Sequence, residues 1–222
     1  SRCFIRRFAI PEWLPFISHF KPVYQYKKGE QIIQEGDPVN GIFFIYEGKV
    51  KVHKKWEAGK DYILRLAKFG DILGHRGYGG ELYYPISATA LEPSKICFIN
   101  NDLFDRLLRT NNDLTYQLLM FYATELKTAE RRMRNLAHMS VKNRIADALL
   151  MIKEAYGVSA EDNATLNLRM TRKDMAALAG TTYETVIRSL NVLSDDKLVA
   201  VNGKTIKLLN EQKLRALSQP EN

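Results

Sequence analysis

One segment constrains the fold of this chain more than any other, the run TRKDMAALAGTTYETVIRSLNVLSD at residues 171–195. Thr171, followed three residues later by Asp174, forms a capping box, which predicts that a helix begins there. Gly180 then interrupts the helical pattern and predicts a turn. We therefore expect two short helices separated by a tight turn.

The second of these helices has two contrasting faces. Thr181 with Glu184 repeats the capping signal and predicts where the helix starts. Behind it, apolar residues recur at helical spacing and predict a buried stripe: Val186, Leu190 and Leu193. The opposite face is expected to be exposed and is mostly polar: Tyr183, Glu184, Ile187, Arg188 and Asn191. An exposed polar face held by a buried stripe is what a helix needs to enter the major groove of DNA.

The exposed face carries side chains suited to reading bases. Arg188 can donate two hydrogen bonds to guanine N7 and O6, and Glu184 can accept one from cytosine N4. Ile187 offers an apolar surface to a thymine methyl group. Five further residues are expected to contact phosphate oxygens: Thr171, Arg172, Thr182, Thr185 and Lys204.

A hairpin is expected directly after the reading helix. LVAVNGKTIKLL, at 198–209, consists of two short apolar runs joined at Asn202-Gly203, the signal for a type I′ turn. Such a hairpin would be the wing of a winged helix, with Lys204 at its tip. A small three-helix module with charged solvent-facing surfaces is the alternative that periodicity leaves open.

Residues 171–208 resemble the helix-turn-helix and wing of the Crp/Fnr superfamily of bacterial transcription regulators. The resemblance implies that Glu184 and Arg188 read the core of each half of a two-fold symmetric site. Tyr183 stands where catabolite-activating members have an arginine. The outer position of each half-site is therefore expected to be read differently.

The N-terminal half changes to the two-residue period of β-strands. Short strands are expected at 23–26, 31–34, 41–47, 50–54, 62–67, 86–91 and 95–99, with glycines between most of them. This pattern is typical of an all-β barrel or jelly roll. YKKGEQIIQEGDPVNGIFFIYEGKVKV and FGDILG also resemble the cyclic-nucleotide-binding β-roll of the same superfamily. We expect an α+β protein with a β-roll sensor domain at 1–110.

A long helix is expected to follow, beginning at Asn112 or Asp113. A narrow apolar seam runs along it at alternating steps of three and four: Leu119, Tyr122, Leu126, Ala129, Met133 and Leu136. The seam predicts a parallel homodimer, although a helix lying on its own domain would also show an apolar stripe. We expect residues 111–139 to be the dimerisation helix, with a hinge at 138–140, and 140–222 to be the winged-helix domain.

The nucleotide cassette of the superfamily is altered in this sequence. Nucleotide-binding members have Gly-Glu-Leu on the FGD run and, about ten residues later, an Arg-Ser or Arg-Thr pair that neutralises the cyclic phosphate. Here His75-Arg76 follows FGDILG, and Pro85 or Ile86 stands at the arginine position before Ser87. A phosphate buried against Ile86 without a counter-charge would cost several kcal/mol. We therefore expect no control by cyclic AMP.

Two alternatives remain for the altered pocket: it binds another acidic small molecule beside His75-Arg76, or it binds nothing. The adenine-contacting positions of the dimer helix align with Ala129 and Glu130. The expected pocket residues are Gly74, His75, Arg76, Ile86, Ser87, Ala129 and Glu130.

Composition narrows the class of protein. The 222 residues carry a net charge of +8 with a pI near 9.4, which favours a polyanionic partner. Two cysteines, Cys3 and Cys97, cannot supply an iron–sulfur cluster or a disulfide framework, and no His-x-His metal pair occurs. No apolar run suits a bilayer and no signal peptide is evident, so a cytoplasmic location is expected.

The sequence therefore predicts a sequence-specific DNA-binding regulator that is not an enzyme and uses no cofactor or metal. Its expected partners are double-stranded DNA, a second copy of the chain and RNA polymerase, with no membrane. One rival is a sensor module that acts through protein contacts. The other is a metal-dependent β-roll enzyme, which the absence of a ligand cluster disfavours.

Overall fold

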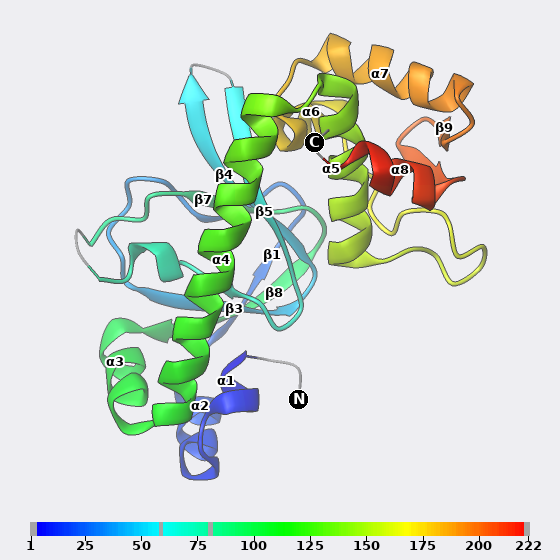
Figure 1. Cartoon of the computed structure of the whole chain (residues 1–222). Coiled ribbons are helices and arrows are strands. Elements are labelled where there is room, and N and C mark those ends of the chain that lie inside the picture. Colours follow the sequence, from blue (N-terminus) through cyan, green and yellow to red (C-terminus); the bar gives the residue numbers. More distant parts are fainter. Residues whose placement is uncertain (1–3, 58–59, 80–81, 220–222) are drawn as a thin grey trace. The chain divides into compact units, whose positions relative to one another are not determined.

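The computed structural model describes residues 4–57, 60–79 and 82–219. The chain forms two compact units, Ser1–Lys55 with Leu64–Lys127, and Trp56–Ile63 with Thr128–Asn222. The long helix α4 (Asn112–His138) contributes residues to both units (Figure 1).

The first unit is built around two four-stranded sheets, ordered β1-β8-β3-β6 and β2-β7-β4-β5. β3 pairs antiparallel with β8 and β6, and β7 pairs antiparallel with β2 and β4. The strands are β1 (Val23–Tyr26), β2 (Gln31–Ile33), β3 (Gly41–Glu47), β4 (Lys49–Glu57), β5 (Lys60–Lys68), β6 (Ile72–Leu73), β7 (Ser87–Ala90) and β8 (Ser94–Asn100). The expected β-roll is confirmed, with β6 as a strand that the sequence pattern did not reveal.

Strand β3 is buried on both faces. Ile45 belongs to a core cluster that joins the two sheets, whereas Ile42 and Phe44 belong to a second cluster beneath the helices. The run GIFFIYE is nearly continuous in apolar residues because both of its faces pack against other elements. The second cluster includes residues of four helices: α1 (Phe4–Phe8), α2 (Leu14–Phe20), α3 (Asn101–Thr110) and α4.

The second unit carries the expected winged helix. Helix α5 (Val141–Tyr156) packs against α6 (Arg172–Ala179), α7 (Tyr183–Asp195) and α8 (Glu211–Leu217). Strands β9 (Val199–Asn202) and β10 (Thr205–Leu208) form an antiparallel hairpin beside α7 (Figure 1). An isolated bridge from Thr165 to Lys207 adds a third short segment to this hairpin.

The break between α4 and α5 falls at residues 139–140, within the segment expected to act as a hinge. Ser140 caps α5 by accepting a hydrogen bond from the Asn143 N–H at 3.3 Å. Arg144 donates to the carbonyls of Leu136 and Met139 at 3.3 and 3.1 Å. The same guanidinium donates to the carbonyls of the α6–α7 turn, Ala179 and Gly180, at 3.0 and 3.2 Å. One side chain therefore joins the end of α4 to the helix-turn-helix.

Candidate functional site

Local contacts fix the start of α6 and the turn that follows it. Thr171 is the N-cap of α6, as predicted, because its hydroxyl accepts from the Asp174 N–H at 3.0 Å. The same hydroxyl donates to the Asp174 carboxylate at 2.7 Å. Gly180 adopts the left-handed conformation, with φ of +63°, and a Cβ there would lie 2.5 Å from the Leu136 side chain. A larger residue would therefore disturb both the turn and the end of α4.

The start of α7 corrects one prediction. Thr182 is the N-cap, accepting from the Thr185 N–H at 3.3 Å, and the predicted cap at Thr181 is wrong. The Thr181 N–H still bonds to the carbonyl of Ala176 at 3.0 Å, so this residue belongs to the end of α6.

The two faces of α7 differ as expected. Val186, Leu190 and Leu193 are buried in the core of the second unit. The opposite face is exposed along its length, including two large apolar side chains, Tyr183 at 50% and Ile187 at 37% exposure. Glu184, Arg188 and Asn191 complete this exposed face, which is called the recognition surface below.

Hydrogen bonds at the start of α7 orient Arg188. Its Nη2 donates to Thr185 Oγ1 at 3.3 Å, and the Thr185 and Thr182 hydroxyls are 2.9 Å apart. Within the described part of the chain, neither Arg188 nor Glu184 forms an ion pair within 4.0 Å. Both charges are therefore available to an external partner.

The wing confirms the predicted hairpin but not its turn type. Asn202 pairs with Thr205, so Gly203 and Lys204 are the two central residues. Gly203 has φ of +56°, whereas Lys204 does not have a positive φ. A positive φ at the first central residue alone is the pattern of a type II′ turn, so the type I′ turn predicted at Asn202-Gly203 is wrong. Lys204 is exposed in the turn.

Arg172 has a structural contact that the sequence did not suggest. Its Nη2 donates to the carbonyl of Gly203 at 2.7 Å, which ties the start of α6 to the wing turn. Burial lowers the pKa of the Arg172 guanidinium. Its contact with phosphate remains a prediction, as do those of Thr171, Thr182, Thr185 and Lys204.

The expected effector residues of the β-roll are largely buried. Gly74 has φ of +81°, which the left-handed start of the following short helix requires. His75 is 4%, Ser87 3% and Ile86 4% exposed. The Ser87 hydroxyl accepts from the Glu35 N–H at 3.0 Å and from the Gln31 side chain at 3.3 Å. Ala129 and Glu130 belong to the second unit.

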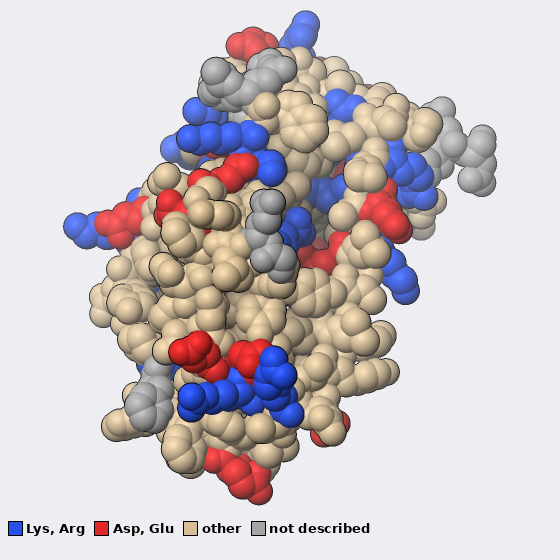
Figure 2. Space-filling model, turned by 90° about the vertical axis from the view of Figure 1, so that its left-hand side faces the viewer, with Lys and Arg blue, Asp and Glu red and all other residues tan. Residues whose placement is uncertain are grey.

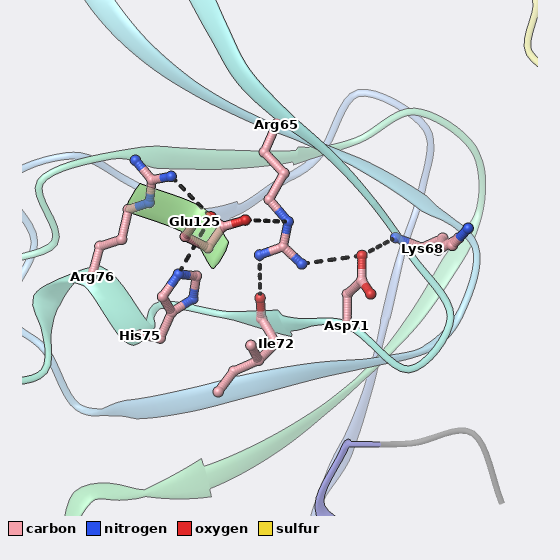
Figure 3. Close-up of polar contacts among 7 residues, drawn as sticks. All are labelled: Arg65, Lys68, Asp71, Ile72, His75, Arg76 and Glu125. Atoms are coloured by element: carbon pink, nitrogen blue, oxygen red, sulfur yellow. Dashed lines mark hydrogen bonds and ion pairs between the residues drawn. The ribbon is translucent and has the colours of Figure 1, made fainter. Parts of the chain in front are cut away.

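A charged cluster lies beside these residues (Figure 3). Arg76 pairs with Glu125 of α4 at 3.0 Å, and Arg65 of β5 lies 3.8 Å from the other Glu125 oxygen. Arg65 also pairs with Asp71 at 3.1 Å and donates to the Ile72 carbonyl at 3.1 Å. The four side chains Arg65, Asp71, Arg76 and Glu125 are called the Glu125 cluster below. The sequence pointed to Arg76 but not to the other three, and Glu125 lies 49 residues from Arg76 in the chain.

His75 contributes no positive charge to this cluster near neutral pH. Burial, and then the charges of Arg65 and Arg76, lower the pKa of the His75 imidazole to about 3. The ring stacks edge-on against Phe121 and Tyr122, with centroids 4.9 and 5.6 Å apart.

One residue of the predicted dimer seam also contacts the chain's own β-roll. Tyr122 is half-buried, and its hydroxyl donates to the His75 carbonyl at 2.5 Å. An aromatic side chain with a hydroxyl fits a partly buried position that offers a carbonyl. The remaining large seam residues are exposed, Leu119, Leu126, Met133 and Leu136 at 36–66%, and Ala129 is half-buried. Tyr116 and Met120 of the same helix are also exposed, at 58% and 45%.

Metal ligands, cysteines and long apolar helices bear on the other functional classes. No group of three or more His, Cys, Asp or Glu side chains among them is arranged to hold a metal ion. Cys97 lies in β8 and is buried. No helix within the described ranges is both long and apolar enough to cross a bilayer.

Surface charges are often paired, as in Asp105–Arg109 and Glu35–Lys54. Figure 2 shows a face on which acidic and basic side chains are interspersed.

Comparisons with protein families match both halves of the chain. Residues 23–111 match the cyclic nucleotide-binding domain, and residues 143–217 match the Crp-like helix-turn-helix domain. The chain is 31% identical over 200 residues to the cAMP-activated global transcriptional regulator CRP of Salmonella typhimurium, covering 88% of this chain and 91% of that protein. It is 28% identical over 202 residues to electron transport regulator A of Shewanella oneidensis, covering 91% and 79%.

Solved structures resemble the chain over most of its length. FixK2 from Bradyrhizobium japonicum superposes with a TM-score of 0.80 at 24% identity, covering 91% of this chain and 99% of that one. TTHA1359, a CRP/FNR family transcriptional regulator from Thermus thermophilus, gives a TM-score of 0.74 at 26% identity, covering 89% and 98%.

Proposed function

Since the chain belongs to the Crp/Fnr family of DNA-binding transcription regulators, we propose that it acts as a homodimer that binds palindromic DNA without cyclic AMP. The observation that carries this proposal is the recognition surface of α7. Its charged residues Glu184 and Arg188 are exposed and lack ion-pair partners within the described part of the chain. They are proposed to read base edges, while Tyr183 contacts the outer position of each half-site and Ile187 meets a thymine methyl group.

The stripe on α4 supports a homodimer. Leu119, Leu126 and Met133 are each more than 60% exposed on one helix, although they are large and apolar. A helix that leaves such a stripe uncovered gains stability when a second copy of the stripe packs against it. A two-fold dimer would present two copies of α7 to successive turns of the duplex, which matches a palindromic site.

The β-roll residues fit a cyclic nucleotide poorly. The buried Ile86, at the position where nucleotide-binding members carry an arginine, offers no charge to a phosphate. The nearby cations, Arg65 and Arg76, are already paired with carboxylates of the chain itself. Although this chain resembles a cAMP-activated regulator, we propose that it binds DNA without that effector.

The remaining assignments follow from this role. The segments 1–110, 111–139 and 140–222 are proposed to serve as sensor-derived β-roll, dimerisation helix and DNA-binding domain. We propose a cytoplasmic, non-enzymatic protein that contacts RNA polymerase at its target promoters.

The test combines sedimentation with DNA binding. We expect the purified protein to sediment as a dimer and to bind a palindromic duplex, selected from a random pool, with the same affinity with and without cyclic AMP. A requirement for cyclic AMP, reflected in a large and saturable gain in affinity, would contradict the proposed independence. A monomer that binds single half-sites equally well would contradict the dimer.

A further inference from the structure

Glu125 lies between two arginines that come from different parts of the β-roll (Figure 3). One of its oxygens is 3.0 Å from Arg76 Nη2, and the other is 3.8 Å from Arg65 Nε. The carboxylate itself is carried by α4. It therefore links residues 112–127 of this helix, which belong to the first unit, to β5 and to the segment after β6.

The charges of the cluster balance only when Glu125 is present. Asp71 pairs with Arg65, but Glu125 is the one carboxylate among the described residues that pairs with Arg76. The side chains of Arg65, Glu125 and Arg76 are 13%, 19% and 29% exposed. Water therefore screens these charges only in part. Removing the carboxylate would leave a shielded arginine charge unpaired, which would strongly destabilise the folded protein.

The surroundings favour an anion at this point. The Arg65 guanidinium lies over the ring of Phe121, 5.2 Å from the ring centroid. The neutral imidazole of His75 has its Nε2 atom 3.9 Å from the Glu125 carboxylate. Two guanidinium groups on a low-dielectric surface, with a single carboxylate between them, form an anion site.

We propose that this cluster is a carboxylate-binding site permanently occupied by the chain's own Glu125, which acts as a tethered ligand and anchors α4 to the β-roll. Because the carboxylate is part of the chain, its effective concentration exceeds that of a free acid in solution. An external carboxylate is therefore excluded from the native protein and enters only when Glu125 is removed. The inference deepens the proposed independence from cyclic AMP, since the helix is held without an external anion.

The test is chemical rescue of Glu125→Ala. This change removes the carboxylate and leaves space between the arginines. We expect this variant to melt at a lower temperature than the wild type. Sodium formate or acetate should raise its melting temperature saturably, and by more than sodium chloride at the same concentration does. Wild-type protein and Glu125→Gln, in which a neutral amide fills the space, should show no such specific response. Asp105→Ala is the matched control, because Asp105 pairs with Arg109 on the open surface and leaves no enclosed site.

A double-mutant cycle covers the case in which Glu125→Ala does not fold. Arg76→Gln, Glu125→Gln and the double variant are compared by thermal unfolding, and we expect the double variant to lose clearly less than the sum of the single losses. Additive losses would overturn the proposal, as would a Glu125→Ala protein that responds no differently to formate and chloride. Neither measurement uses DNA or a nucleotide, so failure here is distinguishable from failure of the proposed function.

Discussion

The recognition surface and the Glu125 cluster use the same two residue types in opposite ways. On α7, Glu184 and Arg188 are exposed and form no ion pair within the described residues. In the β-roll, Arg76 and Glu125 are shielded and pair at 3.0 Å. An exposed charge remains hydrated and can meet a partner, whereas a shielded charge must be matched within the fold. The difference indicates that the charges of the recognition surface are available to a ligand, whereas those of the Glu125 cluster stabilise the fold.

The largest expected effect is at the stripe on α4. Leu126→Glu should place a carboxylate on each copy at the two-fold contact and convert the dimer to a monomer. DNA affinity should then fall by about a hundredfold or more, because a second half-site contributes several kcal/mol. Sedimentation and fluorescence anisotropy measure the two effects. Leu82→Glu, at an exposed leucine of the β-roll, is the control. Equal losses of DNA affinity and of the dimer in both variants would contradict the proposed role of the α4 stripe.

Arg188→Ala and Arg76→Ala test the comparison directly. Loss of Arg188 should weaken binding by about 1–3 kcal/mol and relax the choice at one guanine, because a bidentate base contact is lost. Loss of Arg76 should lower the melting temperature and leave the base preference unchanged. Binding to a panel of single-base variants measures this. A changed base preference in Arg76→Ala would break the distinction between the two regions.

The stability of the protein should depend on pH through His75, which is buried beside the Glu125 cluster. The pKa of His75 is about 3 in the folded protein and near 6.5 when unfolded, so the unfolded state takes up the proton first as pH falls. The free energy of unfolding should therefore fall by about 1.4 kcal/mol per pH unit below pH 6.5, until about pH 3.

His75→Phe removes the titrating group and keeps an aromatic ring against Phe121 and Tyr122. Urea unfolding at pH 7 and pH 5.5 should show a smaller loss of stability in this variant than in the wild type. Identical losses in the two proteins would mean that His75 is not the group responsible.

The smallest expected effect is at the wing. Lys204 is exposed at the turn, so Lys204→Ala should weaken binding by less than about 1 kcal/mol on every sequence alike. The slope of log affinity against log salt should become shallower by about 0.9 if one phosphate contact is lost. Titrations at several salt concentrations measure this, and a loss confined to one base sequence would contradict the phosphate role.

Local patterns in the sequence predicted the parts of the fold that local chemistry decides. The capping box at Thr171, the buried stripe of α7 and the hairpin at Gly203 depend on neighbouring residues and were confirmed. The wrong helix start was also a local matter, because threonine is a good cap at 181 and at 182. In the structure the Thr181 N–H bonds to Ala176, and Thr182 accepts the cap hydrogen bond from Thr185.

The features that the sequence did not reveal depend on distant contacts. The seam spacing alone could not show that Tyr122 bonds to the His75 carbonyl, 47 residues away. Nothing in the sequence connects Glu125 to Arg65 or Arg76. The Glu125 cluster therefore required the structure.

The most direct test of the central claim is selection of bound duplexes from a random DNA pool, with wild-type protein and Arg188→Ala in parallel and no cyclic nucleotide. The proposal that paired copies of α7 read DNA predicts that the wild type enriches a palindrome with a G·C pair at the same place in each half. In Arg188→Ala, preference at that pair alone should be lost. Enrichment of unsymmetric sequences, or the same palindrome from both proteins, would contradict the account.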